Sequence, residues 1–397
     1  MPTLDAITAG ESHGPALIVV ISGLPSGVPI DLAFVNAELA RRQGGYGRGA
    51  RQRIEHDAAE VLSGVRGGVT LGSPLAIRIP NADARLDDPT RTPPLTRPRP
   101  GHADLAGSIK YLTTDCRPIL ERASARETAA RTAAGAIARC FLRVFDIEAF
   151  GFVRSIRGIA TDAVPTPATW QALRALRDAS ETYCPDAAAT AAQCEAIRQA
   201  KIDKDTVGGL VEAHVFGCPP GLGSCMDWRD KLDARLAYAV MGIQAIKSVE
   251  VGLGKEAADR VGSAFHDPIR FDRSAADGPT LGFVRDSNNA GGTEGGMSNG
   301  QPIVVRAAMK PISTLLRGMP SVDLTTKEPA TSTYERSDIC AVSAASVVLE
   351  NVAAFEVARA FREKFGGDSL TEVRANHANF LRLARMMPLD PPSATLA

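Results

Sequence analysis

Two segments of the chain share one pattern: Gly14-Pro-Ala-Leu-Ile-Val-Val-Ile-Ser-Gly-Leu-Pro-Ser-Gly27 and Gly208-Gly-Leu-Val-Glu-Ala-His-Val-Phe-Gly-Cys-Pro-Pro-Gly221. Each starts at a glycine, continues as a strand-like apolar run and ends in Gly-x-Pro-x-Gly, a turn signal. A helix candidate follows each turn, over 31–42 and over 228–246. Since the segments are offset by 194 residues (208 minus 14), the pattern predicts two related halves, about 1–200 and 201–387.

The rest of the chain mixes helix and strand signals without regular alternation. A capping-box pattern, Ser124-Ala-Arg-Glu127, predicts a helix to about residue 145, and a second helix is predicted over 344–365 before Gly366-Gly367. This order favours a layered α+β fold over a doubly wound parallel sheet. The predicted strands cover 17–21, 76–79, 210–216, 249–251 and 303–309.

Four further stretches are expected to lie outside the strands. Residues 81–101 are rich in proline, arginine and aspartate, and residues 286–302 are rich in glycine and asparagine, so both are predicted to be functional loops. The alanine-rich stretch 185–199 is expected to be a surface helix of an insertion between the halves. The tail 388–397 is expected to be disordered.

Composition excludes several classes of protein. In 397 residues, 45 basic and 45 acidic side chains cancel, so no overall field favours nucleic acid or an anionic membrane. There is no membrane-spanning apolar run, and the N-terminus does not resemble a signal peptide, so a soluble cytoplasmic protein is expected. Seven scattered cysteines without a Cys-x-x-Cys pair predict free thiols and no metal site.

Three motifs suggest other functions but lie in the wrong context. Gly10-Glu-Ser-His-Gly14 matches the serine hydrolase elbow, yet a strand is expected after it where the elbow needs a helix. Residues 249–257 resemble a dinucleotide fingerprint, but no row of βαβ units surrounds them, so a tight turn is favoured. The arginine- and glycine-rich run 41–53 suggests RNA binding, but Glu55 and Asp57 follow it, which favours a loop for a small anionic ligand.

Two histidines stand out because glycines frame their loops. His13 lies in Gly-Glu-Ser-His-Gly and His102 in Arg-Pro-Gly-His-Ala-Asp, where exposed imidazoles could move protons near neutral pH. Arginines near them, together with a helix N-terminus, predict one anion site. Lys310 and the loop 288–300 predict a second. The arginines are Arg42, Arg48, Arg51, Arg99 and Arg126; the remaining histidines, His56, His214, His266 and His377, are expected to be structural or solvated.

Seven segments in this order resemble the chorismate synthase family. They are TAGESHG, RRQGGYGRGARQRIEHD, RPGHADLAGSIKY, ERASARETAARTAAGAIAR, QAIKSVEVGLG, NNAGGTEGGMSNGQPIVVRAAMKP and RSDICAV, running from Thr8 to Val342. The resemblance implies 1,4-anti-elimination of phosphate from 5-enolpyruvylshikimate 3-phosphate, giving chorismate in the shikimate pathway to aromatic amino acids. It also implies a lyase that requires reduced FMN without net redox change.

The resemblance assigns a role to individual residues. His13 would protonate the leaving phosphate, His102 would address the N1 side of the flavin, and Asp338 would work with Ser12 near flavin N5. The substrate would be bound by Arg42, Arg48, Arg99, Arg126 and Arg336. FMN would be bound by Arg122, Ala123, Ser124, Gln244, Ala245, Gly295, Lys310, Pro311, Ile312, Ser313, Thr314 and again Arg336, and NADP would contact Arg42 and Arg48.

The resemblance also implies a fold and an assembly. The implied fold is a single catalytic domain over 1–387, a β-α-β sandwich of antiparallel sheets around a helical core. The implied assembly is a homotetramer. Because no reductase domain is visible, flavin reduced by an external reductase is favoured, while reduction by NADPH stays open. The sequence departs from the family at Leu4-Asp5-Ala6-Ile7, at Thr206 and in a short loop before Arg99.

Overall fold

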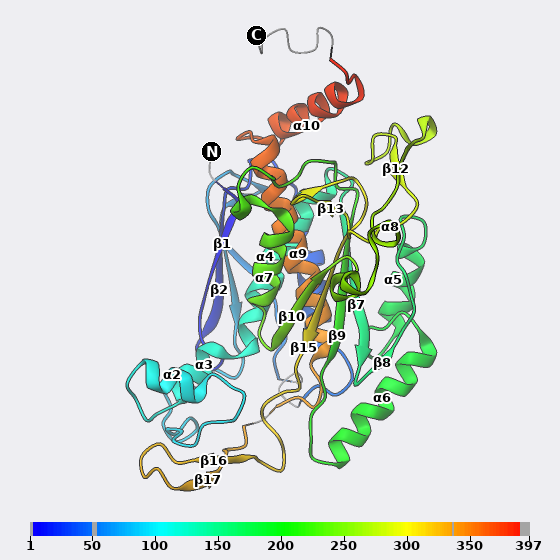
Figure 1. The fold of residues 1–397 in the computed structure, drawn as a ribbon. Helices are drawn as coiled ribbons and strands as arrows, with labels where there is room; N and C mark the ends of the chain where they lie inside the picture. The colour runs from blue at the N-terminus through cyan, green and yellow to red at the C-terminus, as the bar shows by residue number, and fades with distance from the viewer. Residues whose placement is uncertain (1–2, 50–53, 336, 390–397) are drawn as a thin grey trace.

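Two antiparallel sheets enclose a layer of helices (Figure 1). This computed structural model describes residues 3–49, 54–335 and 337–389. The chain order mixes strands and helices, and the long helices α4 (Thr128–Arg143) and α9 (Val342–Phe365) pack against each other between the sheets. The α+β sandwich expected from the sequence is therefore confirmed.

The first sheet has the order β1-β2-β6-β3, with every neighbouring pair antiparallel. It consists of β1 (Asp5–Ala9), β2 (Ala16–Ser22), β6 (Leu75–Pro80) and β3 (Glu60–Ser63). On β2 the alternate side chains Leu17, Val19 and Ile21 are buried, as expected for a strand with one face on the core. The strands predicted at 17–21 and 76–79 are confirmed, whereas β1 was not predicted.

The second sheet has the order β10-β15-β9-β7-β8. It consists of β10 (Ile246–Val251), β15 (Ile303–Met309), β9 (Gly209–Phe216), β7 (Glu148–Ile156) and β8 (Ile159–Ala160). Three of these strands were predicted, while β7 and β8 were not. Because β7 and β8 precede residue 200, this sheet takes strands from both predicted halves.

Helices outside the second sheet cover its other face (Figure 1). Trp170, at the start of α5 (Trp170–Ala179), packs in a cluster with Phe150, Phe152 and Phe216 of the sheet. The helix α6 (Ala187–Ile202) contacts β7 and β8. It confirms the helix expected at 185–199.

The central helix α9 is buried almost all round, which its run of alanine and valine residues allows. Its partner α4 approaches so closely at Gly135 that a Cβ there would lie 2.3 Å from the carbonyl oxygen of Asn351. The helix α1 (Leu32–Gln43) begins at Asp31, whose side chain accepts a hydrogen bond from the amide of Phe34. The helices predicted at 31–42 and 344–365 are confirmed.

The two segments of the sequence repeat have matching local structures. Each contains a strand in the middle of its sheet, β2 or β9, and each strand leads through a turn to a helix, α1 or α7 (Leu232–Met241). Gly23 and Gly27 have φ of +84° and +86°, and Gly217 and Gly221 have φ of +82° and +84°. Glycine is favoured at these four places because other residues rarely adopt positive φ. The division of the whole chain into repeated halves stays a prediction.

Two helix predictions are corrected. Ser124 caps a 3-10 turn, Ala125–Glu127, and α4 begins after it. No capping box forms, because Glu127 binds the Thr8 hydroxyl and the Gln244 amide with its carboxylate. The helix predicted over 228–246 is shorter, since α7 ends at Met241 and Ile246 already starts β10.

Shorter elements complete the described chain. None of its helices is both long and apolar enough to cross a membrane. The helix α10 (Leu370–Arg385), which was not predicted, follows α9 after a turn. The tail 390–397 lies outside the described residues. The remaining elements are α2 (Asp104–Lys110), α3 (Arg117–Ala123), α8 (Gly262–Phe265), β4 (Val65–Arg66), β5 (Val69–Thr70), β11 (Ile269–Phe271), β12 (Phe283–Arg285), β13 (Thr293–Glu294), β14 (Met297–Ser298), β16 (Pro320–Val322) and β17 (Pro329–Thr331).

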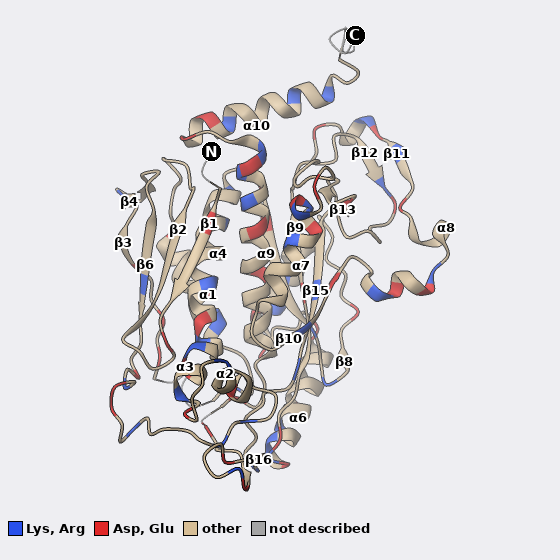
Figure 2. Ribbon diagram, turned by 60° about the vertical axis from the view of Figure 1, so that its left-hand side comes forward, with Lys and Arg blue, Asp and Glu red and all other residues tan. Residues whose placement is uncertain are grey.

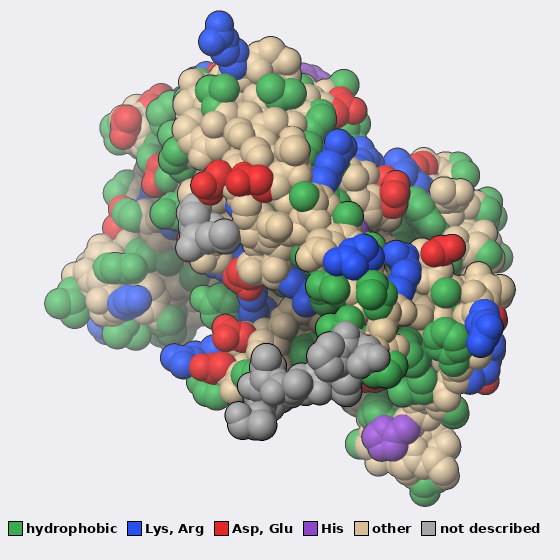
Figure 3. Space-filling view, turned by 90° about the horizontal axis from the view of Figure 1, so that it is seen from above, with side chains coloured by type: hydrophobic (Ala, Val, Ile, Leu, Met, Phe, Trp, Pro, Cys, Tyr) green, Lys and Arg blue, Asp and Glu red, His purple; other side chains and the backbone are tan. Residues whose placement is uncertain are grey.

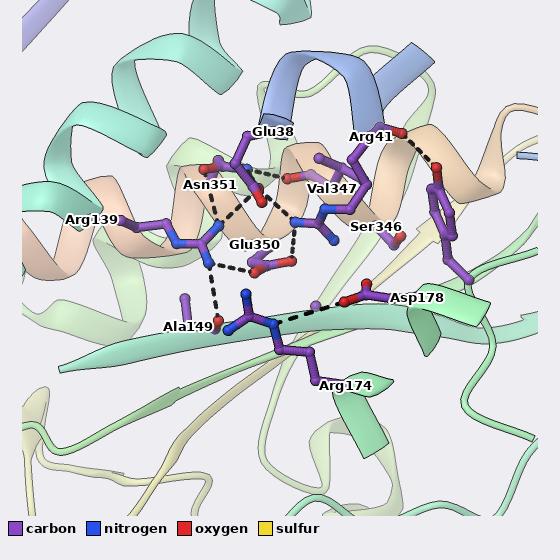
Figure 4. A network of polar contacts seen from close by, with 12 residues as sticks. Glu38, Arg41, Arg139, Ala149, Arg174, Asp178, Ser346, Val347, Glu350 and Asn351 are labelled. Atoms are coloured by element: carbon purple, nitrogen blue, oxygen red, sulfur yellow. Dashed lines mark hydrogen bonds and ion pairs between the residues drawn. The ribbon is translucent and has the colours of Figure 1, made fainter. Parts of the chain in front are cut away.

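Charged residues lie inside the fold as well as outside it. Figure 2 shows them along α1 and α9 in the helical layer, and Figure 3 shows basic and acidic side chains interspersed on the face that carries α10. Five of the interior residues form the core ionic cluster: Glu38, Arg41, Arg139, Arg177 and Glu350. Figure 4 labels four of them, Glu38, Arg41, Arg139 and Glu350.

The core ionic cluster connects four helices, α1, α4, α5 and α9, to the second sheet. Arg41 of α1 lies 2.6 Å from both Glu38 and Glu350, and Arg139 of α4 lies 2.8 Å and 2.9 Å from the same two carboxylates. Arg177 adds a contact of 3.1 Å to Glu350 and donates to the carbonyl of Gly151 on β7. Each carboxylate therefore contacts more than one guanidinium group, as burial of charge requires.

Candidate functional site

A cavity of about 440 Å³ opens beside the N-terminal end of α9. Its volume lies within the usual range for small-molecule sites, about 300–1,000 Å³. Six basic side chains line it among the described residues, against three carboxylates, those of Glu55, Glu335 and Asp338. The cavity therefore suits an anion. The basic residues are Arg42, Arg48, Arg85, Arg99, Arg126 and Lys310.

The cavity brings together most of the residues singled out in the sequence. Apolar side chains, several of them alanines of α9, form part of its wall. The predicted site residues in its lining are Ser12, His13, Arg42, Arg48, Arg99, His102, Ala123, Ser124, Arg126, Gln244, Ala245, Lys310, Ile312, Ser313, Thr314 and Asp338.

His13 lies in the loop between β1 and β2 and is only 7% exposed. Its Nδ1 lies 2.9 Å and 3.0 Å from the two carboxylate oxygens of Glu121, and its backbone amide donates to the same carboxylate at 2.9 Å. Burial opposes ionisation of Glu121, but hydrogen bonds from the His13 ring and backbone amide, together with the charge of Arg117, hold the pKa of this carboxyl below its usual range. The expectation of an exposed imidazole is thus wrong for His13, because α3 covers the loop.

The other side of the His13 ring meets the loop 81–101. The guanidinium Nη2 of Arg85 lies 3.1 Å from His13 Nε2, and Asp83 lies 3.8 Å from the same nitrogen. Neither Arg85 nor Glu121 was predicted from the sequence. The loop had been marked by its length and composition, but nothing in its sequence distinguishes Arg85 from Arg91 or Arg97.

His102 is held in a similar way at the start of α2. Its Nδ1 lies 2.5 Å from the carboxylate of Asp104, which also accepts from Nε of Arg99 at 2.8 Å. Burial opposes ionisation of Asp104, but the hydrogen bonds from His102 and Arg99 hold its pKa well below its usual range. Arg99 in turn donates to the hydroxyl of Thr314 at 3.0 Å. Each histidine therefore has a buried carboxylate at Nδ1.

Two of the predicted arginines share one carboxylate. Arg42 lies 2.8 Å and Arg126 lies 2.6 Å from Asp57, which comes after the segment 50–53 that lies outside the described residues. Burial lowers the pKa of Arg42 to about 10; Asp57 opposes this shift, while the like charges of Arg126 and Arg48 add to it. Glu55 lies 3.9 Å from Arg126 as a second carboxylate.

The loop after α1 carries Arg48 to a different carboxylate. Arg48 lies 3.4 Å from Asp338, and the amide of Gly49 donates to Asp338 at 2.6 Å. Asp338 therefore joins the loop before α9 to the glycine-rich loop after α1. Arg51 lies outside the described residues, as does Arg336 in the segment before Asp338.

Further polar groups of the cavity lining lack full partners. The buried Oε1 of Gln244 has no hydrogen-bond partner, and its Nε2 donates to Glu127. Lys310 donates to the carbonyl of Gly101 at 2.8 Å, and burial with the nearby charges of Lys247 and Arg99 lowers its pKa. These groups are available to a ligand.

Several predicted residues do not line the cavity. Arg122 is exposed and donates to the carbonyls of Thr8 and Gly10, Gly295 is exposed in the β13–β14 hairpin, and Pro311 lines a shallow pocket on the other side of β15. The second anion site predicted from Lys310 with loop 288–300 is corrected: this loop is absent from the described lining, and its amides at 289 and 290 bind Asp267.

Two of the other motifs have structural explanations. Gly10–Gly14 joins two antiparallel strands and leads into no helix, unlike a hydrolase elbow. At Gly252, φ is +60° and a Cβ would lie 2.2 Å from the carbonyl of Asn289, so the fingerprint-like motif is a tight turn. All seven cysteines are free thiols, and no cluster of metal-binding side chains occurs in the described parts of the chain.

Comparison with known proteins gives one consistent result. The family model described as chorismate synthase matches residues 4–361. The chain is 52% identical over 391 residues to the chorismate synthase of Desulforudis audaxviator, covering 96% of this chain and 98% of that protein. It is 52% identical over 395 residues to that of Geobacter sulfurreducens, covering 96% and 99%. A crystal structure of chorismate synthase matches with a TM-score of 0.78 and 38% identity, covering 97% of this chain and 99% of the other.

Proposed function

Because this chain belongs to the chorismate synthase family, and is therefore an enzyme, we propose that it converts 5-enolpyruvylshikimate 3-phosphate into chorismate and phosphate. The reaction is a 1,4-anti-elimination by a lyase, the last common step of the shikimate pathway. The observation that carries the proposal is the pair of histidines, each with a buried carboxylate at Nδ1, on a cavity where basic side chains outnumber acidic ones.

The basic residues bind the substrate, which carries a phosphate and two carboxylates. Arg42, Arg126 and Arg48 all line the cavity, paired with Asp57, Glu55 and Asp338. Guanidinium groups suit this task because they bind phosphate and carboxylate with two parallel hydrogen bonds. Arg99 contributes from the side of His102, and Arg336 is assigned to the substrate by the family motif.

His13 and His102 handle protons in this proposal. His13 protonates the phosphate as it leaves, and His102 holds a proton on the opposite side of the cavity. Asp338 and Ser12 complete the catalytic set. The buried wall excludes water, so that each charged contact is stronger than it would be in solvent.

The cavity fits FMN on its remaining side. Alanines 123, 245, 341, 344 and 345 leave room beside Val348 and Ile312 for a flat ring, and the unpartnered Oε1 of Gln244 offers an acceptor to a ring N–H. Lys310, Ser313, Thr314 and Ser124 supply donors for a phosphate. When bound in its reduced form, FMN would supply the electron needed during elimination and recover it, without net redox change.

Four further features belong to the proposal. The chain acts as one catalytic domain over 1–387, assembles as a homotetramer and works in the cytoplasm. An external reductase supplies the reduced flavin, with NADPH bound near Arg42 and Arg48 as the alternative source. The assigned FMN contacts of Arg122, Gly295 and Pro311 lie outside the cavity wall of this single chain.

The test is an anaerobic incubation with 5-enolpyruvylshikimate 3-phosphate, following both phosphate and chorismate. We expect equal amounts of the two products with dithionite-reduced FMN, and none with oxidised FMN alone. Product formation with NADPH plus FMN would show that the chain reduces its own flavin. Absence of both products with reduced FMN would refute the proposed function.

A further inference from the structure

The hydrogen bonds around His13 determine which of its ring nitrogens carries a proton. On the Nδ1 side, both carboxylate oxygens of Glu121 lie within 3.0 Å of the ring, and Oε2 also accepts a hydrogen bond from the His13 backbone amide, so both oxygens act as acceptors, as in the ionised form. An ionised carboxylate only accepts hydrogen bonds, so His13 donates to it from Nδ1. Arg117, 3.7 Å from Glu121, adds a positive charge behind this pair.

On the Nε2 side the neighbour is a donor. The Nη2 of Arg85 lies 3.1 Å from His13 Nε2. A guanidinium group has no acceptor, so this contact is a hydrogen bond only if Nε2 presents its lone pair. His13 is therefore neutral in this arrangement, and it has no proton to give to a leaving group on the cavity side.

We propose that Arg85 and Glu121 together make His13 take up its catalytic proton when the substrate binds. In the free enzyme the guanidinium group of Arg85 donates a hydrogen bond to Nε2 of His13. A phosphate group placed between the two accepts hydrogen bonds from Arg85 and from a newly protonated Nε2. Glu121 is the positioning residue that keeps Nδ1 protonated and stabilises the imidazolium that results. This inference rests on the proposed function, since it assumes a phosphorylated substrate.

The surroundings allow Arg85 to change partners. Its side chain is 15% exposed, it lines the cavity, and its buried Nε lacks a hydrogen-bond partner, with Asp83 at 3.5 Å. Glu121, by contrast, is fully buried and is held through the His13 amide as well. The guanidinium of Arg85 can therefore turn to an anion in the cavity while the Glu121 carboxylate stays in place.

The proton balance is simple. One proton passes from solvent to His13 Nε2 as the substrate binds. When the bond between the ring carbon and the phosphate oxygen breaks, that proton passes to the phosphate oxygen and His13 becomes neutral again. The proton on Nδ1 stays in its bond to Glu121 throughout, and Arg85 can return to Nε2 after phosphate leaves.

Calorimetry of substrate binding in buffers of different ionisation enthalpy tests this inference. With oxidised FMN present there is no turnover, and at about pH 8 an ordinary histidine is neutral and a phosphate ester doubly charged. We expect an uptake of about one proton per site in the wild type. We expect far less in His13→Gln, which has no group to accept the proton, and in Glu121→Gln, which loses the stabilising charge. We also expect less in Arg85→Met, because without the guanidinium group the carboxylates of Glu121 and Asp83 favour a proton on Nε2 before the substrate binds.

Arg91→Met is the matched control. Arg91 lies on the same loop and also contacts Asp83, at 3.3 Å, but it is not among the residues lining the cavity. Its replacement should leave proton uptake unchanged. Normal turnover by a wild type that takes up no proton would overturn the inference while leaving the proposed function intact, and so would equal uptake by His13→Gln and the wild type.

A second measurement needs no substrate. Nitrogen-15 spectra of the histidine-labelled free enzyme, assigned by the signals that disappear in His13→Gln, should show His13 neutral with its proton on Nδ1. A proton on Nε2, or an imidazolium, would overturn the inference whatever the activity. If the positioning role is correct, Glu121→Gln lowers kcat at least about tenfold with KM nearly unchanged, because it acts on proton transfer and not on binding.

Discussion

Two neighbouring arginines near the end of α1 face opposite surroundings. Arg41 turns into the core ionic cluster, where Glu38 and Glu350 each lie 2.6 Å away. Burial opposes its charge, but these two carboxylates raise the pKa of Arg41. Arg42 turns into the cavity, where it shares Asp57 with Arg126, and burial with like charges lowers its pKa to about 10.

Both side chains are buried, so burial alone does not distinguish structure from function. The difference is access to a ligand. In the core cluster three guanidinium groups and two carboxylates contact one another inside the protein, and none of the five residues lines the cavity. Arg42 and Arg126 also pair with carboxylates, but both line the cavity, where an anion can reach them. Changes in the cavity should therefore reduce activity, and changes in the core cluster should reduce stability.

The largest expected effect is that of His102→Ala in the cavity. Turnover should fall by about a hundredfold to ten-thousandfold, the usual loss for a positioned acid or base. Folding should change little, because Asp104 keeps its contacts with Arg99. Phosphate release by the purified variant and its thermal unfolding check both statements. Near-normal turnover would remove His102 from the mechanism.

The next effect tests the core cluster. Glu350→Ala leaves three arginines with one fewer carboxylate, and it should lower the free energy of unfolding by about 3–5 kcal/mol. Turnover per folded molecule should stay within a few-fold. Glu363→Ala is the control, because its contact with Arg235 is exposed and should contribute less than about 1 kcal/mol. Urea unfolding measures the free energy of unfolding of both variants. Equal losses in the two variants would contradict a structural role for the core ionic cluster.

A smaller effect is expected for Arg48→Ala. Substrate binding should weaken by about 1.5–3 kcal/mol, the range for a hydrogen bond to a charged group. FMN binding should change less, since Arg48 lies beside Asp338 and away from Lys310 and Gln244. Calorimetric titration with each ligand measures the two affinities. Loss of flavin affinity with unchanged substrate affinity would reverse this division of the cavity.

The smallest expected effect separates packing from charge in the core. Gly135→Ala should destabilise the protein by about 1–3 kcal/mol, because its Cβ would lie 2.3 Å from the Asn351 carbonyl and push α4 away from α9. Helix propensity alone predicts the opposite, a gain of about 1 kcal/mol. Thermal unfolding shows whether Gly135→Ala lowers or raises the stability of the protein. A stabilised variant would show that α4 and α9 have room between them for the added methyl group.

Much of the fold was predictable because its signals are local. Apolar stretches followed by Gly-x-Pro-x-Gly turns marked β2 and β9, and a long alanine- and valine-rich run ending at glycines marked α9. The predictions failed where tertiary contacts override such signals. Glu127 forms no capping box because its carboxylate binds Thr8 and Gln244, both distant in sequence. The segment of β7 has no clear strand pattern of its own, and its pairing within the second sheet makes it a strand.

The site, like the fold, has features that the sequence predicts and features that only tertiary contacts create. The residue types, the glycine frames of His13 and His102 and the family motifs are properties of the chain, so the sequence sufficed to identify the family. The pairing of His13 with Glu121, 108 residues away, and with Arg85, 72 residues away, needed the packing of α3 and the loop 81–101 around it. So did the opposite orientations of Arg41 and Arg42. Charge balance depends on distances of a few ångströms between segments remote in sequence, and folding brings those segments together.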